Sequence, residues 1–341
     1  MSTTPDIPGV LSADEVVASA RSIADLQLAT GMIPWFVGGH CDPWNHVETA
    51  MALDVAGFHD HAERAYEWLV DIQRPDGSWW NYYLPDGSVE EAKLDSNVCA
   101  YVATGVWHHW LCTWDRAFVD HLWPTVERAL DWVLSLRRAD GTVLWAVTED
   151  GRPWDYALLT GSASIAHALH CGARLADLVN EPRPEWRLAG DRLAHVVATD
   201  PDAFEPKTRW AMDWYYPVLT GALTGERAKV RLAEGWAEFA MEGKGIRCVS
   251  DEPWITASET AECAIAHAAA GDLTTATDLL QWTRTHRRED GSYWTGIVYP
   301  TLERFPFDET SAYTAAAVIL AADAITGASP ASGVFAGRLP A

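Results

Sequence analysis

The chain has few basic residues, and this limits the partners it can bind. Its 341 residues include 25 lysines and arginines against 48 aspartates and glutamates, which gives a formal net charge of −23. Such an excess of negative charge is repelled by the phosphates of nucleic acids and of anionic lipids. We therefore expect neither nucleic acid nor a charged membrane surface as a partner.

Long apolar runs, a secretory signal and closely spaced cysteines are also missing. No apolar stretch reaches the roughly 18–20 residues that a membrane span needs. The N-terminus lacks the basic start and apolar core of a signal peptide. The six cysteines are scattered, with no Cys-x-x-Cys, so the pattern requires no disulfide and lacks the spacing of a zinc site. These absences predict a cytoplasmic protein with free thiols.

Tryptophan, in contrast, is abundant at 19 residues, and some of it belongs to a repeat. Three segments each combine an amphipathic helix, a basic residue, Asp-Gly and an aromatic residue, at 64–79, 128–145 and 276–294. Glycine after the last helical turn allows a left-handed stop, and Asp-Gly forms a tight turn. The repeats therefore predict a chain built from helical hairpins.

Charged helices alternate with alanine-rich, weakly charged ones, whose composition suits burial on most sides. The charged helices are expected at about 12–29, 60–73, 116–138, 185–198, 226–241 and 272–288. The apolar helices are expected at about 44–56, 96–112, 156–179, 213–224, 255–270 and 309–326. No segment convincingly predicts a strand.

Six such pairs predict an all-α fold, an (α/α)6 toroid of six outer and six inner helices. Closing the ring covers the apolar faces that an open helical-repeat scaffold, the alternative, leaves at its ends. We expect one domain over 1–327 and a C-terminal tail over 328–341 that packs on the surface. Links from outer to inner helices are long, so binding and catalysis are expected at the end where these loops gather.

An acidic residue, usually beside an aromatic one, stands near the start of every apolar helix. Helix capping explains the acid at any single start but not the repeated aromatic residues. In a toroid all six starts converge on one mouth, where aromatic faces can stack on sugar C–H groups and carboxylates can accept hydroxyl hydrogen bonds. The expected substrate-binding residues are Asp42, Trp44, His46, Asp95, Trp154, Asp213, Trp214 and Trp254.

Neither a metal nor a cofactor is expected. His40, His46 and Glu48 lack the His-x-x-x-His or Glu-x-x-His spacing of a metal site. The pair Gly38-Gly39 is too short for a phosphate-binding loop, and the chain has no Gly-x-Ser-x-Gly elbow.

The repeats resemble those of the α/α-toroid superfamily, and two of its branches are similar to this chain. The motifs Asp76-Gly77-Ser78-Trp79 and Asp290-Gly291-Ser292-Tyr293-Trp294 resemble repeats of squalene-hopene cyclases and prenyltransferase β-subunits. The order of segments resembles the glucoamylase-type six-hairpin glycosidases, as does the stretch 122–133. In those glycosidases an aspartate that opens the first inner helix binds the terminal sugar, and Asp42 matches it.

Both branches differ from this chain at residues that carry chemistry. The acidic Asp-x-Asp-Asp cluster of class II terpene cyclases is absent, and Thr310 stands where a prenyltransferase would have a zinc-binding histidine. The glycosidases normally have their general-acid glutamate directly after the Leu-Trp of the third hairpin, whereas here Leu144-Trp145 is followed by Ala146 and the nearest acid is Glu149.

The sequence favours a carbohydrate-active enzyme, an inverting glycoside hydrolase that acts on a neutral sugar. Such an enzyme uses two carboxyls roughly 6.5–9.5 Å apart with a water molecule between them. The expected acid is Glu149 or Asp155, and the expected base is Asp308 or Glu309 at the sixth inner helix. An acidic mouth repels diphosphates and uronates but not neutral sugars, which ranks sugar above isoprenoid.

Three alternatives remain open. An isoprenoid cyclase or prenyltransferase-like enzyme would stabilise a carbocation on aromatic faces, with Asp42 or Asp308 as the proton donor. A toroid without catalytic activity would bind a sugar or a peptide. An isomerase of a free sugar would use His40 or His46 as its base. A polar cavity with opposed carboxylates would favour the hydrolase, and an apolar aromatic cavity the cyclase.

Overall fold

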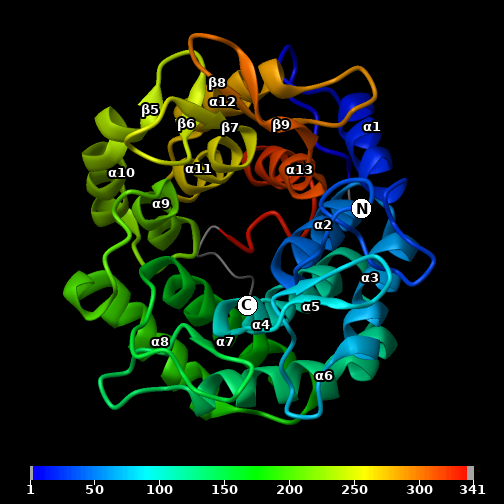
Figure 1. Cartoon of the computed structure of the whole chain (residues 1–341), viewed down its shortest axis with the longest axis vertical. Helices are drawn as coiled ribbons and strands as arrows, with labels where there is room; N and C mark the ends of the chain where they lie inside the picture. The colour runs from blue at the N-terminus through cyan, green and yellow to red at the C-terminus, as the bar shows by residue number, and fades with distance from the viewer. Residues whose placement is uncertain (1–2, 336–341) are drawn as a thin grey trace.

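The computed structural model describes residues 3–335 and contains two concentric rings of helices (Figure 1). The outer ring consists of α1 (Ala13–Ala24), α3 (His59–Ile72), α6 (Arg116–Ser135), α8 (Pro184–Thr199), α10 (Gly225–Phe239) and α12 (Leu273–Trp282). The inner ring consists of α2 (Pro43–Val55), α4 (Ser96–Ala100) with α5 (Val102–Thr113), α7 (Leu159–Val179), α9 (Ala211–Leu219), α11 (Ala257–Ala269) and α13 (Ala312–Thr326). This arrangement confirms the all-α toroid expected from the alternating composition.

The inner ring is closed by contacts between its own helices. Each inner helix packs against the next in the chain, and α13 packs back against α2. The inner helices are therefore buried on most sides, whereas an outer helix such as α3 buries one stripe that includes Ala62, Tyr66 and Leu69. Among the described residues, no helix has the length and apolar character needed to cross a membrane.

The Asp-Gly turns that follow outer helices brace each hairpin against the next one. In all three repeats the aspartate accepts the hydroxyl of the residue two positions on, at 2.6–2.7 Å. Gly77 has a φ of +95°, and a Cβ there would lie 2.3 Å from the carbonyl oxygen of Arg128 on α6. Gly291 has a φ of +88°, and a Cβ there would lie 2.6 Å from the backbone of Ala18 on α1, so the last turn closes the outer ring. These positions require glycine for its conformation and for its size.

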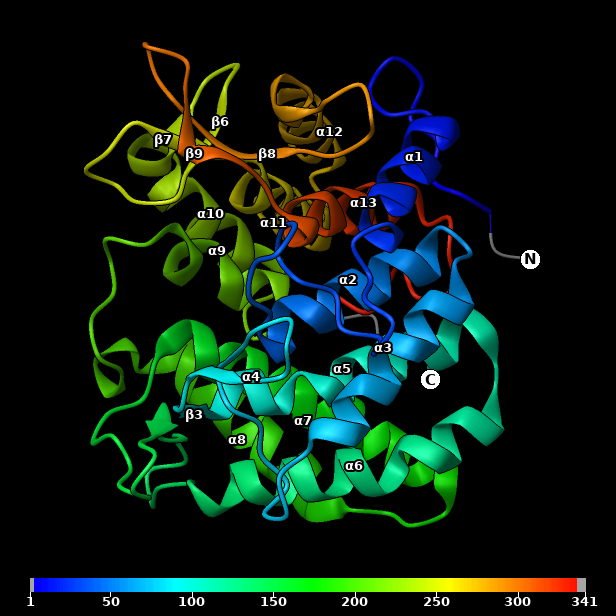
Figure 2. The ribbon, with the colours of Figure 1, turned by 45° about the vertical axis from the view of Figure 1, so that its right-hand side comes forward.

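Short strands, which the sequence did not predict, occupy the long loops at the mouth. They are β1 (Tyr82–Tyr83), β2 (Val89–Glu91), β3 (Leu94–Asp95), β4 (Ala146–Val147), β5 (Ala240–Met241), β6 (Gly245–Arg247), β7 (Trp254–Thr256), β8 (Trp294–Val298) and β9 (Glu303–Thr310). The last five form one antiparallel sheet in the order β5-β6-β7-β8-β9, and the hairpin of β8 and β9 projects from the ring (Figure 2). Asp308 and Glu309 therefore lie on a strand, because β9 pairs with β8 up to Thr310 and delays the start of α13.

The segment after α13 closes the ring at the end opposite the mouth. It crosses the middle of the ring in Figure 1, and Ala331, Val334 and Phe335 are buried. His167 of α7 holds the carbonyl oxygen of Val334 through Nε2 at 2.8 Å. The part of the expected tail over 336–341 lies outside the described residues. The described part forms a floor inside the ring, because its apolar side chains fill the space between the ends of the inner helices. The expectation that it packs on the surface is therefore wrong.

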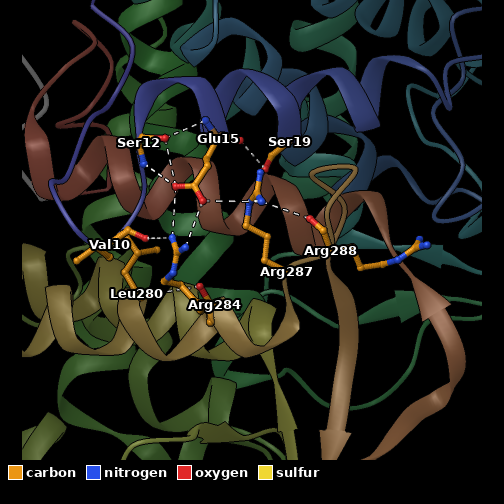
Figure 3. Close-up of polar contacts among 9 residues, drawn as sticks. Val10, Ser12, Glu15, Ser19, Leu280, Arg284, Arg287 and Arg288 are labelled. Carbon is orange, nitrogen blue, oxygen red and sulfur yellow. Dashed lines mark hydrogen bonds and ion pairs between the residues drawn. The ribbon is translucent and has the colours of Figure 1, made fainter.

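A charged cluster joins the first outer helix to the last (Figure 3). Glu15 of α1 caps its own helix by accepting the N–H of Ser12 at 2.9 Å. Its carboxylate also accepts two bonds from Arg284, at 3.2 and 3.3 Å, in the 3-10 turn Thr283–His286 that follows α12. Burial opposes ionisation of Glu15, but the Ser12 N–H and Arg284 outweigh it and lower its pKa. The ionised carboxylate therefore stabilises ring closure.

We predict that Glu15→Gln lowers the free energy of unfolding by about 0.5–1 kcal/mol at pH 7. Because the pKa of Glu15 is lower in the folded chain, its contribution is present above the ordinary value of 4.5 and is lost as the pH falls through the folded value. Urea unfolding at several pH values measures this difference, with Asp278→Asn on the exposed face of α12 as the control. A destabilisation that is unchanged at acid pH would contradict it.

Candidate active site

A cavity of about 480 Å³ opens at the mouth, where the inner helices begin. This volume is typical of a small-molecule site, for which about 300–1,000 Å³ is usual. Its wall combines hydrogen-bonding side chains with aromatic faces. The polar members are Asp42, Asn45, Asn81, Lys93, Asp95, Asn97, Thr160, Lys207 and Asp213, and the aromatic members are Trp35, Trp44, Tyr82, Trp145 and Trp210.

Asp42 is fixed at the start of α2 by bonds to both of its oxygens. Its Oδ1 accepts the backbone N–H of Asn45 at 3.0 Å, which makes it the N-cap, and Pro43 follows at the first helical position. Its Oδ2 accepts the Trp35 indole N–H and the Asn45 side-chain amide, each at 2.7 Å. Burial raises the pKa of Asp42, while these donors favour the ionised form. The same residue thus caps the helix and lines the cavity.

Asp95 and Asp213 are held in comparable ways on other inner helices. Asp95 caps α4 and accepts the Trp145 indole N–H at 2.5 Å. Asp213 lies within α9 and accepts the Thr160 hydroxyl of α7 at 2.6 Å. Burial raises the pKa of both carboxyls, and Lys93 opposes this at Asp95. The cavity therefore has three carboxyls of fixed orientation on three inner helices.

Two further carboxyls, those of Glu48 and Glu262, lie deeper in the ring. Among the described residues, neither forms a salt bridge with a lysine, arginine or histidine. Glu48 accepts the Trp44 indole N–H and the Tyr101 hydroxyl, each at 3.3 Å. Glu262 accepts the Tyr215 hydroxyl. Burial, with further repulsion from nearby acids, raises the pKa of Glu48 to about 7 and that of Glu262 well above its ordinary value. Because Trp44 also lines the cavity, Glu48 connects this buried layer to the cavity wall.

Glu259 is a further carboxyl in the first turn of α11, outside the lining of the central cavity. It is half-buried, and its Oε2 accepts the Ser258 hydroxyl at 2.6 Å. Burial raises the pKa values of Glu48 and of Tyr313 on α13, and the negative charges of Asp42 and Glu259 both add to this effect. Since α13 packs against both α2 and α11, the two acids act on Glu48 and Tyr313 from different inner helices.

Four of the eight expected sugar-binding side chains line the cavity, namely Asp42, Trp44, Asp95 and Asp213. The other four lie elsewhere. His46 is buried, accepts the Ile33 N–H through Nδ1 and donates to the Ala65 carbonyl through Nε2, so neither ring nitrogen is available as an isomerase base. Trp254 stacks on Phe305 of β9 at 4.5 Å, Trp154 lies at the rim against Trp145 at 5.3 Å, and Trp214 stacks on Phe239 of α10 at 5.5 Å.

The expected catalytic carboxyls lie on the loops around the mouth. Glu149 and Asp155 are exposed, and Asp308 is exposed beside Arg304 at 3.4 Å. Glu309 is half-buried and accepts the Thr295 hydroxyl at 2.9 Å. None of these four side chains lines the central cavity.

The sequence analysis did not single out several residues in and near the site. Glu259 and Glu262 are the only acids in the alanine-rich stretch 257–269, where they lie three residues apart on one helix face. Asn81, Lys93 and Lys207 come from loops and carry no sequence signal that separates them from other polar loop residues. No group of three or more His, Cys, Asp or Glu side chains among the described residues is arranged to hold a metal ion.

Solved structures of sugar-processing enzymes share this fold. A glycosidase superimposes with a TM-score of 0.74 over 92% of this chain and 96% of its own, at 14% identity. A D-mannose isomerase superimposes with a TM-score of 0.65 over 93% of this chain and 99% of its own, at 12% identity. No family model matches the chain.

The toroid and its cavity of carboxylates and indole rings define a carbohydrate-active enzyme, a glycoside hydrolase. A protein from Mycolicibacterium hassiacum, MMP endo-(1,4)-3-O-methyl-α-D-mannosidase, is 49% identical over 337 residues, which cover 99% of this chain and 93% of that protein. The chain belongs to the family of this mannosidase.

We predict that Glu48→Gln makes the stability of the protein less sensitive to pH. The raised pKa means that the protonated form stabilises the folded chain below pH 4.5, and this contribution is lost as the pH rises through about 7. Glutamine cannot ionise and keeps an oxygen for Trp44 and Tyr101. The variant should exceed the wild type by about 1–3 kcal/mol at pH 8 and match it more closely at pH 5. Parallel pH profiles in urea unfolding would contradict this.

Proposed function

We propose that the chain is an endo-acting mannosidase that hydrolyses α-1,4 bonds within a glycan of 3-O-methyl-D-mannose. The family relative acts on this class of bond, and the near-complete coverage of both chains supports the same substrate here. The central cavity carries the proposal, because it joins oriented carboxylates to several indole rings. A methyl ether is apolar and cannot donate a hydrogen bond, so it suits an indole face, while the remaining hydroxyls suit Asp95 and Asp213.

The proposed catalytic pair is Asp42 and Glu259. The charges of both carboxyls act on Tyr313, one from the start of α2 and one from the first turn of α11, and each is held by its own hydrogen bonds. Asp42 lines the central cavity, and Glu259 lies outside its lining. In an inverting hydrolase one carboxyl protonates the leaving oxygen, while the other removes a proton from the water that attacks the anomeric carbon from the opposite face. The water oxygen bonds to that carbon as the glycosidic C–O bond breaks.

The four carboxyls expected from the sequence take other roles in this proposal. Glu149, Asp155 and Asp308 are exposed to water and lie outside the lining of the central cavity, so the fold does not enclose them around a bound sugar. Glu309 lies near His40, and in this proposal it contacts the glycan outside the scissile bond.

We predict that Asp42→Asn and Glu259→Gln each lower kcat by about 10²–10⁴-fold on an α-1,4-linked 3-O-methyl-mannose oligosaccharide, because general acid–base catalysis contributes this much. Product sizes measured by mass spectrometry test for internal cleavage, and NMR of the first product tests for inversion of the anomer. Asp308→Asn is the matched control and should retain wild-type kcat.

An aryl mannoside with a good leaving group separates the two roles. The variant that lacks the acid should keep most of its activity on this substrate, since the leaving group needs no proton, and the variant that lacks the base should not. Full activity of both variants on the oligosaccharide, or loss of activity in Asp308→Asn alone, would refute the assignment. Cleavage of no mannoside by the wild type would refute the proposed function.

A further inference from the structure

A second, larger hollow of about 760 Å³ lies beside the central cavity. One wall is the outer helix α10, which presents Glu234 and Glu238 on successive turns. The opposite wall is the loop 201–208, which follows α8, and Tyr156 from the third hairpin contributes a further side. This outer cleft lies outside the ring of inner helices.

The outer cleft and the central cavity have a common boundary. Asp213 and Lys207 line both hollows. An aromatic stack crosses the same boundary, because Trp145 of the central cavity and Tyr156 of the cleft stack at 5.6 Å with an angle of 20° between their planes. A ligand that leaves the central cavity over Asp213 therefore enters the cleft directly.

The side chains of the cleft suit a neutral polyhydroxylated ligand. Among the described residues, no side chain donates a hydrogen bond to the exposed carboxylates of Glu205, Glu234 and Glu238. Carboxylates accept hydrogen bonds from sugar hydroxyls. Arg231 is already engaged, since its guanidinium donates to the backbone oxygens of Asp213 and Trp214. The acidic side chains that line the cleft outnumber its lysine and arginine side chains, which disfavours phosphorylated or carboxylated ligands.

The floor of the cleft is rigid and apolar. Trp214 stacks on Phe239 of α10 with 10° between their planes and donates its indole N–H to the Arg231 carbonyl at 2.7 Å. Gly235 lets the helix approach this indole, since a Cβ there would lie 2.4 Å from the ring. This packing buries Trp214 and Phe239 almost completely, so the aromatic face that the cleft offers to a sugar ring is that of the partly exposed Tyr156.

We propose that the outer cleft is an extended binding site for the same glycan. A chain whose scissile bond lies in the central cavity passes over Asp213 and Lys207, and its next sugar residues lie between α10 and the loop 201–208. This inference rests on the proposed function and goes beyond it, because it assigns the direction in which the glycan leaves the cavity and makes cleavage dependent on chain length.

The experiment compares kcat/KM across α-1,4-linked 3-O-methyl-mannose oligosaccharides of increasing length. For the wild type, kcat/KM should rise with length until the cleft is filled. The double variant E234A/E238A, and separately Tyr156→Ala, should lower kcat/KM for the longest substrates by roughly 5- to 30-fold through KM, as expected for the loss of one or two hydrogen bonds. The shortest cleavable substrate should be processed at the wild-type rate. Glu226→Ala, at the exposed start of α10, is the matched control and should behave as wild type at every length.

The outcomes separate the two proposals. Cleavage by the wild type that is independent of length, or equal losses in the cleft variants on short and long substrates, would overturn the extended site and leave the proposed function intact. If the wild type cleaves none of the series, the proposed function fails and the extended site fails with it. Thermal unfolding of each variant identifies any loss that comes from folding.

Discussion

Closure of the two rings is the constraint on which the rest of the structure depends. The alanine-rich inner helices have no polar face to show to water, so each needs a neighbour on both sides, and α13 supplies the last one by packing on α2. Outside them, the turn at Gly291 lies against α1 and Arg284 binds Glu15, so the last hairpin is joined to the first by backbone contact and by charge. The central cavity exists only because this circle is complete.

The site uses residues that also stabilise helix starts. Asp42 and Asp95 cap α2 and α4, and the same carboxylates face the cavity and bind indole N–H groups. Burial makes these acids costly, and the backbone N–H groups of the helices offset part of that cost. The binding groups are consequently attached to the most rigid part of the fold, which suits the fixed geometry that glycoside cleavage requires.

The helices could be predicted from the sequence because each follows from its own local composition, and the loop lengths then placed the mouth correctly. The strands could not, because β7 pairs with β8, a segment some forty residues further along the chain, and Pro300 and Pro306 interrupt any alternation. In the site, Asp42, Asp95 and Asp213 were recognisable as acids at helix starts, and Asp42 and Asp213 also have a tryptophan close by in the sequence. Glu259 was not recognisable from the sequence. It lies inside an inner helix, and its nearness to the other acids depends on which helices pack against α13.

The floor of the ring has a consequence for the buried acids above it. Phe335 lines the same small void as Glu48 and Glu262, and the segment that carries it follows α13 in the chain. This segment helps to keep water away from the two glutamates, whose pKa values are raised by burial. The environment of the deepest carboxyls therefore depends on a part of the chain that lies outside the six hairpins.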